Sequence, residues 1–145
     1  AHLTLRFLGA SEQTRLERLQ LRLAEVAASA EPIRGKPGAT GAFPGWSRPR
    51  LLWLAVESGS AIERLAGDVE RAARDAGFDP EERRFTPHVT LGRVRGQRGV
   101  AEAARAVRAW APAAPAEPIP EIVLFRSELH PAGARHIPIA RYRIG

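Results

Sequence analysis

The chain has 145 residues and a net charge of +6, which allows one domain with a hydrophobic core and leaves too little chain for two. It has no cysteine, which excludes disulfides, thiolate zinc sites and cysteine nucleophiles, and no apolar run near the roughly 20 residues of a membrane span. We expect a single cytoplasmic domain over residues 1–145 that has no membrane partner and is a monomer.

The basic charge is almost entirely arginine, since Lys36 is the only lysine among 22 basic residues. Arginine forms planar, two-pronged hydrogen bonds to phosphate and stacks on bases, so the composition favours a polyanionic partner such as RNA. A GC-rich genome or a thermophilic host would give the same composition. The charge alone therefore leaves both interpretations open.

The chain begins with an alternating run and a helical pattern. Residues 2–8 alternate polar and apolar side chains and predict a strand. Residues 11–29 carry leucines and a valine on one helical stripe, with Ser11 as the expected N-cap. Prolines and glycines interrupt residues 31–49, which predict one or two short strands joined by loops.

A strand and a second helix follow. Residues 50–57 form a dense apolar run that predicts a buried strand. Residues 60–76 place apolar side chains at helical spacing, with Ser60 as the expected cap and Gly77 at the position after the helix.

The second half of the chain repeats this mixture of elements. It predicts a strand at 86–94, a short helix at about 100–110, a proline-rich connector, and two closing strands at roughly 121–129 and 135–144. Strands that look hairpin-connected, mixed with helices, favour the α+β class.

A His-x-Thr motif occurs twice, as His2 with Thr4 and as His88 with Thr90, each on a predicted strand. Residues i and i+2 of a strand project from the same face, so each histidine shares a face with its threonine. The apolar residues between them point the other way and anchor the strand. Two similar halves facing each other would bring both motifs into one cleft.

Two histidines and two hydroxyls in one cavity suit displacement at phosphorus. One imidazole takes a proton from the attacking water and the other gives a proton to the departing oxygen, because histidine exchanges protons near neutral pH. The threonine hydroxyls, Thr4 and Thr90, would donate hydrogen bonds to phosphate oxygens. The scheme requires no metal or cofactor, and the sequence has no clustered carboxylates and histidines typical of a metal site.

Two arginines are candidates to hold the growing negative charge on the phosphate. Arg93 lies just past the second motif, and Gly92 before it would permit the bulge needed to turn Arg93 toward the site. Arg6 shares a face with His2 and Thr4 if residues 2–8 form a regular strand.

The segments "HLTLRFLG" and "FTPHVTLGRVR" resemble the two signature strands of the two-histidine (2H) phosphoesterase superfamily, in its branch of RNA 2′,3′-cyclic phosphodiesterases, also called 2′-5′ RNA ligases. The resemblance extends to "RPRLLWLAV" at 48–56 and "LFRSELHPAGARHIPIARY" at 124–142, and so covers most of the chain. It implies a bilobed, pseudo-twofold fold in which two antiparallel sheets, with helices outside, flank a central cleft.

The resemblance also implies an activity. It implies metal- and ATP-independent opening of a 2′,3′-cyclic phosphate at an RNA end to a 2′-phosphate, and weak 2′-5′ joining by the reverse reaction. His2 and His88 would be the proton-transfer pair, with His88 the base and His2 the acid, and Thr4, Thr90 and Arg93 would contact the substrate. Members of the family usually have some forty residues before the first motif, whereas this chain starts at Ala1. We therefore expect the sequence to be part of a longer protein.

Other functions stay open at this stage. A second candidate is a phosphodiesterase of ADP-ribose 1″,2″-cyclic phosphate or another small cyclic phosphate. A candidate of another class is a non-catalytic RNA-binding protein, and a further one is an unrelated basic domain with two chance motifs. Among the remaining aromatic residues, Trp46 is a candidate to stack on a base, Trp53 and Trp110 are expected in the core, and His130 and His136 are expected to be structural or exposed.

Overall fold

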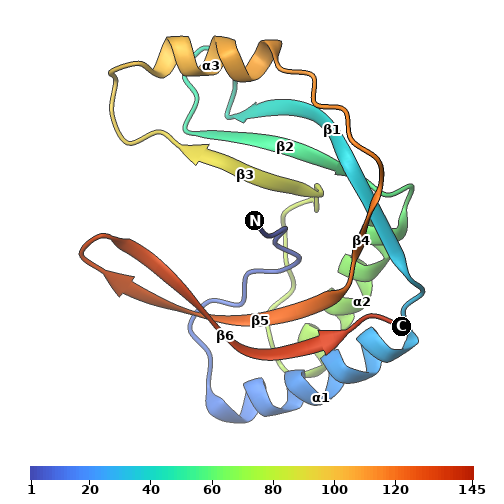
Figure 1. Ribbon diagram of the computed structural model, residues 1–145. Coiled ribbons are helices and arrows are strands. Elements are labelled where there is room, and N and C mark those ends of the chain that lie inside the picture. The colour runs from blue at the N-terminus through green and yellow to red at the C-terminus, as the bar shows by residue number, and fades with distance from the viewer.

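The computed structural model describes residues 1–145 and has the α+β architecture that the sequence predicts, with two antiparallel sheets (Figure 1). The elements, in chain order, are α1 (Gln13–Ser29), β1 (Ile33–Phe43), β2 (Leu51–Glu57), α2 (Ala61–Asp75), β3 (His88–Arg93), α3 (Val100–Ala109), β4 (Glu117–Ile119), β5 (Glu121–His130) and β6 (Gly133–Arg143). One sheet has the order β3-β2-β1-β4, and the other is the β5–β6 hairpin.

The two sheets face one another, and the N-terminal segment runs between them (Figure 1). Helix α3 covers the outer side of the four-stranded sheet, whereas α1 and α2 pack beside the hairpin. The core forms where the apolar stripes of α1 and α2 meet the side of β5 that faces these helices, and its buried residues include Leu19, Leu23, Ile62, Leu65, Val69, Ile122 and Leu124. None of the helices combines the length and the apolar character that a membrane crossing requires.

The ends of the helices follow the predictions only in part. Gly77 lies after α2 with φ of 100°, and the N–H of Phe78 donates to the carbonyl of Ala73, which completes the glycine-based helix stop. At the start of α2, however, the hydroxyl of Ser58, and not that of Ser60, accepts the N–H of Ile62 at 3.1 Å. Ser11 likewise caps nothing, because α1 begins at Gln13.

Strand β1 corrects the prediction of one or two short strands within 31–49. It runs as a single strand of 11 residues, and its pairing with β2 shifts between Pro37 and Thr40. This irregularity accommodates Pro37, which has no N–H to contribute to a regular ladder. The short strand β4, which lies in the predicted connector, pairs with the start of β1.

The predicted strand over residues 2–8 is not formed. Only Leu3 pairs, through a single antiparallel bridge to Val89, and the chain bends at Leu5. Leu3 and Leu5 nevertheless pack against the core. The alternation therefore indicated the inward side chains only up to Leu5, since beyond it Phe7 is 65% exposed whereas the Arg6 side chain is only 9% exposed. A strand also needs a partner along its length, and only Leu3 has one.

Candidate active site

Strand β3 presents the second His-x-Thr motif on one face of the four-stranded sheet. His88 lies opposite Ala55 of β2, and Thr90 lies opposite Trp53. Directly opposite residues of an antiparallel pair point to the same side, so Trp53 shares the face of the two motif residues. Val89 points to the other side of the sheet.

Trp53 therefore belongs to the candidate site, although the sequence predicted it in the core. Its ring centroid is 6.0 Å from that of His88. Gly41 of β1 lies opposite Trp53, and a Cβ on Gly41 would be only 2.0 Å from Trp53 Cζ2. The indole can rest against β1 only because residue 41 is glycine. Alternation along β2 could have indicated that Trp53 points to one face of the sheet. Only the register with β3 shows that this face is the one that carries His88 and Thr90.

A bulge in β3 turns Arg93 to the same face as His88 and Thr90. Thr90 pairs with Trp53 and Gly92 pairs with Leu52, which leaves Leu91 without an opposite residue. One extra residue inverts the alternation beyond it, so Arg93, paired with Leu51, returns to the motif face. The sequence predicted a bulge next to Gly92, and the structure has it at Leu91.

The single bridge at Leu3 places the first motif beside the second. Because Leu3 is opposite Val89 in antiparallel order, His2 comes next to Thr90, and Thr4 comes next to His88. On β3, His88 and Thr90 point to the opposite side from Val89. The two motifs, far apart in sequence, thus meet at the edge of β3.

The imidazole of His88 is held by its own backbone. Its Nδ1 is 2.6 Å from the carbonyl oxygen of Thr86. A carbonyl oxygen only accepts hydrogen bonds, so Nδ1 carries the proton. In the neutral ring, Nε2 is then the atom that is free to accept a proton.

His2 contacts the other sheet as well. Its ring centroid is 5.8 Å from that of Phe125 on β5 and 5.5 Å from that of His136 on β6. His136 is exposed, as expected, but no pattern in the sequence predicts its position beside His2. Only the pairing of β5 with β6 and the position of the N-terminal segment bring the two rings together, so local pattern carried no signal for this contact.

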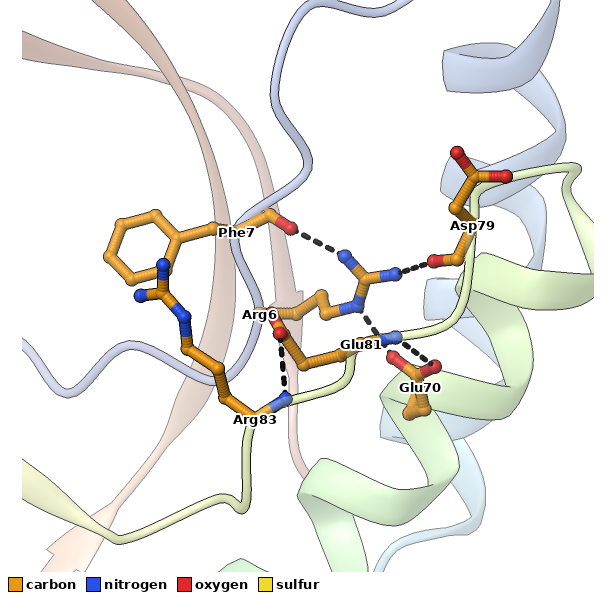
Figure 2. Close-up of polar contacts among 6 residues, drawn as sticks. All are labelled: Arg6, Phe7, Glu70, Asp79, Glu81 and Arg83. Atoms are coloured by element: carbon orange, nitrogen blue, oxygen red, sulfur yellow. Dashed lines mark hydrogen bonds and ion pairs between the residues drawn. The ribbon is translucent and has the colours of Figure 1, made fainter.

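The chain bends at Leu5, and the Arg6 side chain points toward α2 and the loop after it (Figure 2). Its side chain is only 9% exposed and donates to Glu70 at 2.5 Å, and it also donates to the carbonyl oxygens of Phe7 and Asp79. Its predicted contact with substrate required a regular strand. In the structure, Arg6 instead fastens the N-terminal segment to α2 and to the loop after it.

The electrostatics of Glu70 fit this fastening role. Burial alone would raise the pKa of Glu70, but hydrogen bonds from the Glu81 N–H and from Arg6, with the charges of Arg6 and Arg74, outweigh it. The net result is a Glu70 pKa below its ordinary value. Glu70 therefore stays charged and holds Arg6 in place.

The remaining candidates lie outside the motif face or at its border. A cavity of about 280 Å³ adjoins the end of β3 and is lined by Arg93, Arg95 and Arg98 among others. Trp46 lies under the guanidinium of Arg108 at 5.6 Å, and Trp110 is 48% exposed, so Trp110 is not a core residue as predicted. No three histidine, aspartate or glutamate side chains are grouped so that they could hold a metal ion.

Comparison with known proteins identifies relatives over most of the chain. A family model described as the 2′-5′ RNA ligase superfamily matches residues 1–130. The RNA 2′,3′-cyclic phosphodiesterase of Aeropyrum pernix is 38% identical over 100 residues, which is 68% of this chain and 56% of the relative. The protein of the same name from Bacillus subtilis is 37% identical over 92 residues, which is 63% of this chain and 50% of the relative. The chain thus spans about half the length of these two curated relatives.

Solved structures share the fold. The crystal structure of TT0787 of Thermus thermophilus matches with a TM-score of 0.77 at 25% identity, over 99% of this chain and 77% of that one. The crystal structure of E. coli LigT in apo form matches with a TM-score of 0.66 at 22% identity, over 99% of this chain and 75% of that one. These likenesses agree with an α+β arrangement of two facing antiparallel sheets.

Proposed function

Because the chain belongs to the 2′-5′ RNA ligase superfamily, we propose that it is an RNA 2′,3′-cyclic phosphodiesterase that opens the cyclic phosphate at an RNA end to a 2′-phosphate. The observation that supports the proposal is the single Leu3–Val89 bridge, because antiparallel order around it brings the backbone of His2 next to Thr90 and the backbone of Thr4 next to His88. A structural or chance origin of the two motifs would not require the two segments that carry them to pair with each other.

The reaction is a displacement at phosphorus with two proton transfers. Water attacks the phosphorus, and the bond from phosphorus to O3′ breaks, which leaves the phosphate on O2′ and a free 3′-hydroxyl. His88 acts as the base that takes the proton of the water through Nε2, since Nδ1 is committed to Thr86. His2, on the other side of the phosphate, gives a proton to O3′.

The neighbouring groups bind the phosphate. The hydroxyls of Thr4 and Thr90 donate to its non-bridging oxygens, and the guanidinium of Arg93 stabilises the charge that grows on them in the transition state. Proton transfer by two imidazoles needs no metal ion. If the 5′-hydroxyl of a second RNA end takes the place of the attacking water, the same displacement joins the two ends through a 2′-5′ bond.

The active unit is one chain, because both histidines come from the same domain. The proposed location is the cytoplasm, since a chain without cysteine is suited to a reducing compartment. Its partner is the end of an RNA strand. The arginine-rich border beyond Arg93 is suited to the phosphates of such a strand.

The test is hydrolysis of a 2′,3′-cyclic nucleotide with and without EDTA, with the product identified by phosphorus NMR. We expect turnover that EDTA leaves unchanged, and 2′-phosphate as the product. Complete inhibition by EDTA, or 3′-phosphate as the product, would contradict the mechanism. Absence of turnover on both a cyclic nucleotide and a cyclic-phosphate-ended oligoribonucleotide would contradict the activity itself.

A further inference from the structure

A third histidine lies beside the proposed acid. The ring of His136 meets the ring of His2 edge-on, with centroids 5.5 Å apart and an interplanar angle of 71°. Phe125 completes the group, at 5.8 Å from His2 and 6.1 Å from His136. Both contacts of His136 have edge-to-face geometry, which at these separations is favourable for aromatic rings, whereas the His2–Phe125 pair is tilted at 41°.

His2 needs such support because its backbone supplies little. The segment that carries it is tied to the sheet by one bridge at Leu3, and His2 itself is exposed. His88, by contrast, lies within a paired strand and has its Nδ1 bonded to Thr86. A proton donor must be held in a narrow range of orientations to act in a transition state. The orientation of His2 must therefore come from side chains around it.

The hairpin holds His136 in turn. Ser127 of β5 lies opposite His136 of β6, and its hydroxyl is 3.1 Å from His136 Nδ1. The register shift between Leu124 and Phe125 leaves Ile139 unpaired. Because of this shift, His136 lies opposite Ser127 and so on the same face of the hairpin as Ser127 and Phe125. The hairpin thus presents a fixed imidazole and a phenyl ring to His2.

We propose that His136 is a positioning residue, which holds the His2 imidazole in its reactive orientation and is itself oriented by Ser127. The inference rests on the proposed function for its kinetic consequence. The structural consequence, that contact with His136 orders the His2 ring, does not depend on the proposed function.

The kinetic test compares His136→Ala with His136→Phe on a 2′,3′-cyclic nucleotide. An aromatic pair contributes an amount that corresponds to roughly 2- to 13-fold in rate. We expect His136→Ala to lower kcat about 10-fold while KM stays within about 2-fold. His136→Phe keeps the edge-on contact, so we expect its kcat to stay within about 3-fold of the wild-type value. Ser127→Ala should give a smaller loss than His136→Ala.

His130→Ala is the matched control, because His130 is the other histidine of the same hairpin and lies at its turn, opposite Gly133. We expect it to leave kcat unchanged. An unchanged kcat in His136→Ala would overturn the proposal. So would a His136→Phe variant as slow as His136→Ala, or a His136→Ala variant that changes KM alone, since these outcomes indicate a hydrogen bond to substrate.

NMR relaxation of the His2 ring supplies a readout that does not depend on activity. We expect the order of the His2 ring to fall in His136→Ala and to recover in His136→Phe. If wild-type protein turns over no cyclic phosphate, the proposed function fails, while this measurement still decides whether His136 orders His2. An equally ordered His2 ring in wild type and His136→Ala would overturn the inference even if catalysis were confirmed.

Discussion

Replacement of Gly41 by alanine tests how the four-stranded sheet supports the site. The new Cβ would lie 2.0 Å from Cζ2, 2.3 Å from Cε2 and 2.4 Å from Cη2 of Trp53, all far inside van der Waals contact. The indole must therefore move off β1, and His88 lies on its other side, with ring centroids 6.0 Å apart. Overpacking of this kind costs roughly 1–3 kcal/mol. For a chain of this size we expect a fall in Tm of roughly 3–10 °C.

Thermal unfolding followed by circular dichroism measures this change, and the kcat for a 2′,3′-cyclic nucleotide measures displacement of His88. We expect kcat to fall at least roughly 10-fold, because small displacements of a catalytic group cost large factors in rate. Gly67→Ala is the control, since no atom lies within 4 Å of a Cβ at this helical position. It should raise stability by roughly 0.5–1 kcal/mol. Wild-type Tm and kcat in Gly41→Ala would refute the reasoning.

Trp53→Leu supplies a second check on the same contact. Leucine has none of the three ring atoms that would meet the alanine Cβ. In the Trp53→Leu background, Gly41→Ala should therefore lower the free energy of unfolding much less than it does in wild type. The double-mutant cycle should then show strong coupling between residues 41 and 53. Additive effects of the two substitutions would mean that the indole does not rest on Gly41.

Three further predictions concern the candidate site and the Arg6–Glu70 ion pair that holds the N-terminal segment. Arg6→Gln should lower stability by roughly 1–3 kcal/mol at pH 7. The Glu70 pKa is lowered in the folded chain, so ionised Glu70 stabilises the fold above its unfolded pKa of about 4.3, and this stabilisation is lost as pH falls through the folded pKa. The difference in Tm between wild type and Arg6→Gln should therefore narrow below about pH 4. His2→Ala and His88→Ala should each lower kcat by at least roughly 10²-fold with unchanged circular dichroism. Arg93→Gln should lower kcat/KM roughly 10- to 100-fold.

The two arginine predictions each have a matched variant elsewhere on the chain. Arg22→Gln removes an ion pair to Glu25 whose side chains are 52% and 68% exposed, and it should leave Tm nearly unchanged. Arg105→Gln removes an exposed arginine of α3 and should leave kcat/KM unchanged. A pH-independent loss in Arg6→Gln, a near-normal kcat in either histidine variant, or equal effects of Arg93→Gln and Arg105→Gln would each contradict the assigned role.

The sequence predicted the helices and the second motif well because these depend on local patterns. The apolar stripe of α2 continues to Gly77, where the chain needs a positive φ, so both the helix and its end are encoded within one short segment. Alternation in β3 likewise places His88 and Thr90 on one face without any knowledge of its neighbours.

The predictions that failed depend on partners far away in sequence. The alternation of residues 2–8 is typical of a strand, but only Leu3 finds a partner, and the ion pair with Glu70 directs Arg6 elsewhere. The apolar run around Trp53 predicts a core residue, and only the pairing of Trp53 with Gly41 and Thr90 assigns it to the site. These positions depend on the register between strands, and the sequence of one segment alone does not specify that register.

Two unpaired residues decide which side chains the site contains. If Leu91 were paired in a regular ladder, the alternation of β3 would turn Arg93 to the opposite face from Thr90. If Ile139 were paired in a regular ladder, Ser127 would lie opposite Ile137 and not His136, whose ring would lose its hydrogen bond. The face on which Arg93 lies and the pairing of Ser127 with His136 therefore each depend on one irregularity, whereas regular alternation is enough to place His88 and Thr90 on one face.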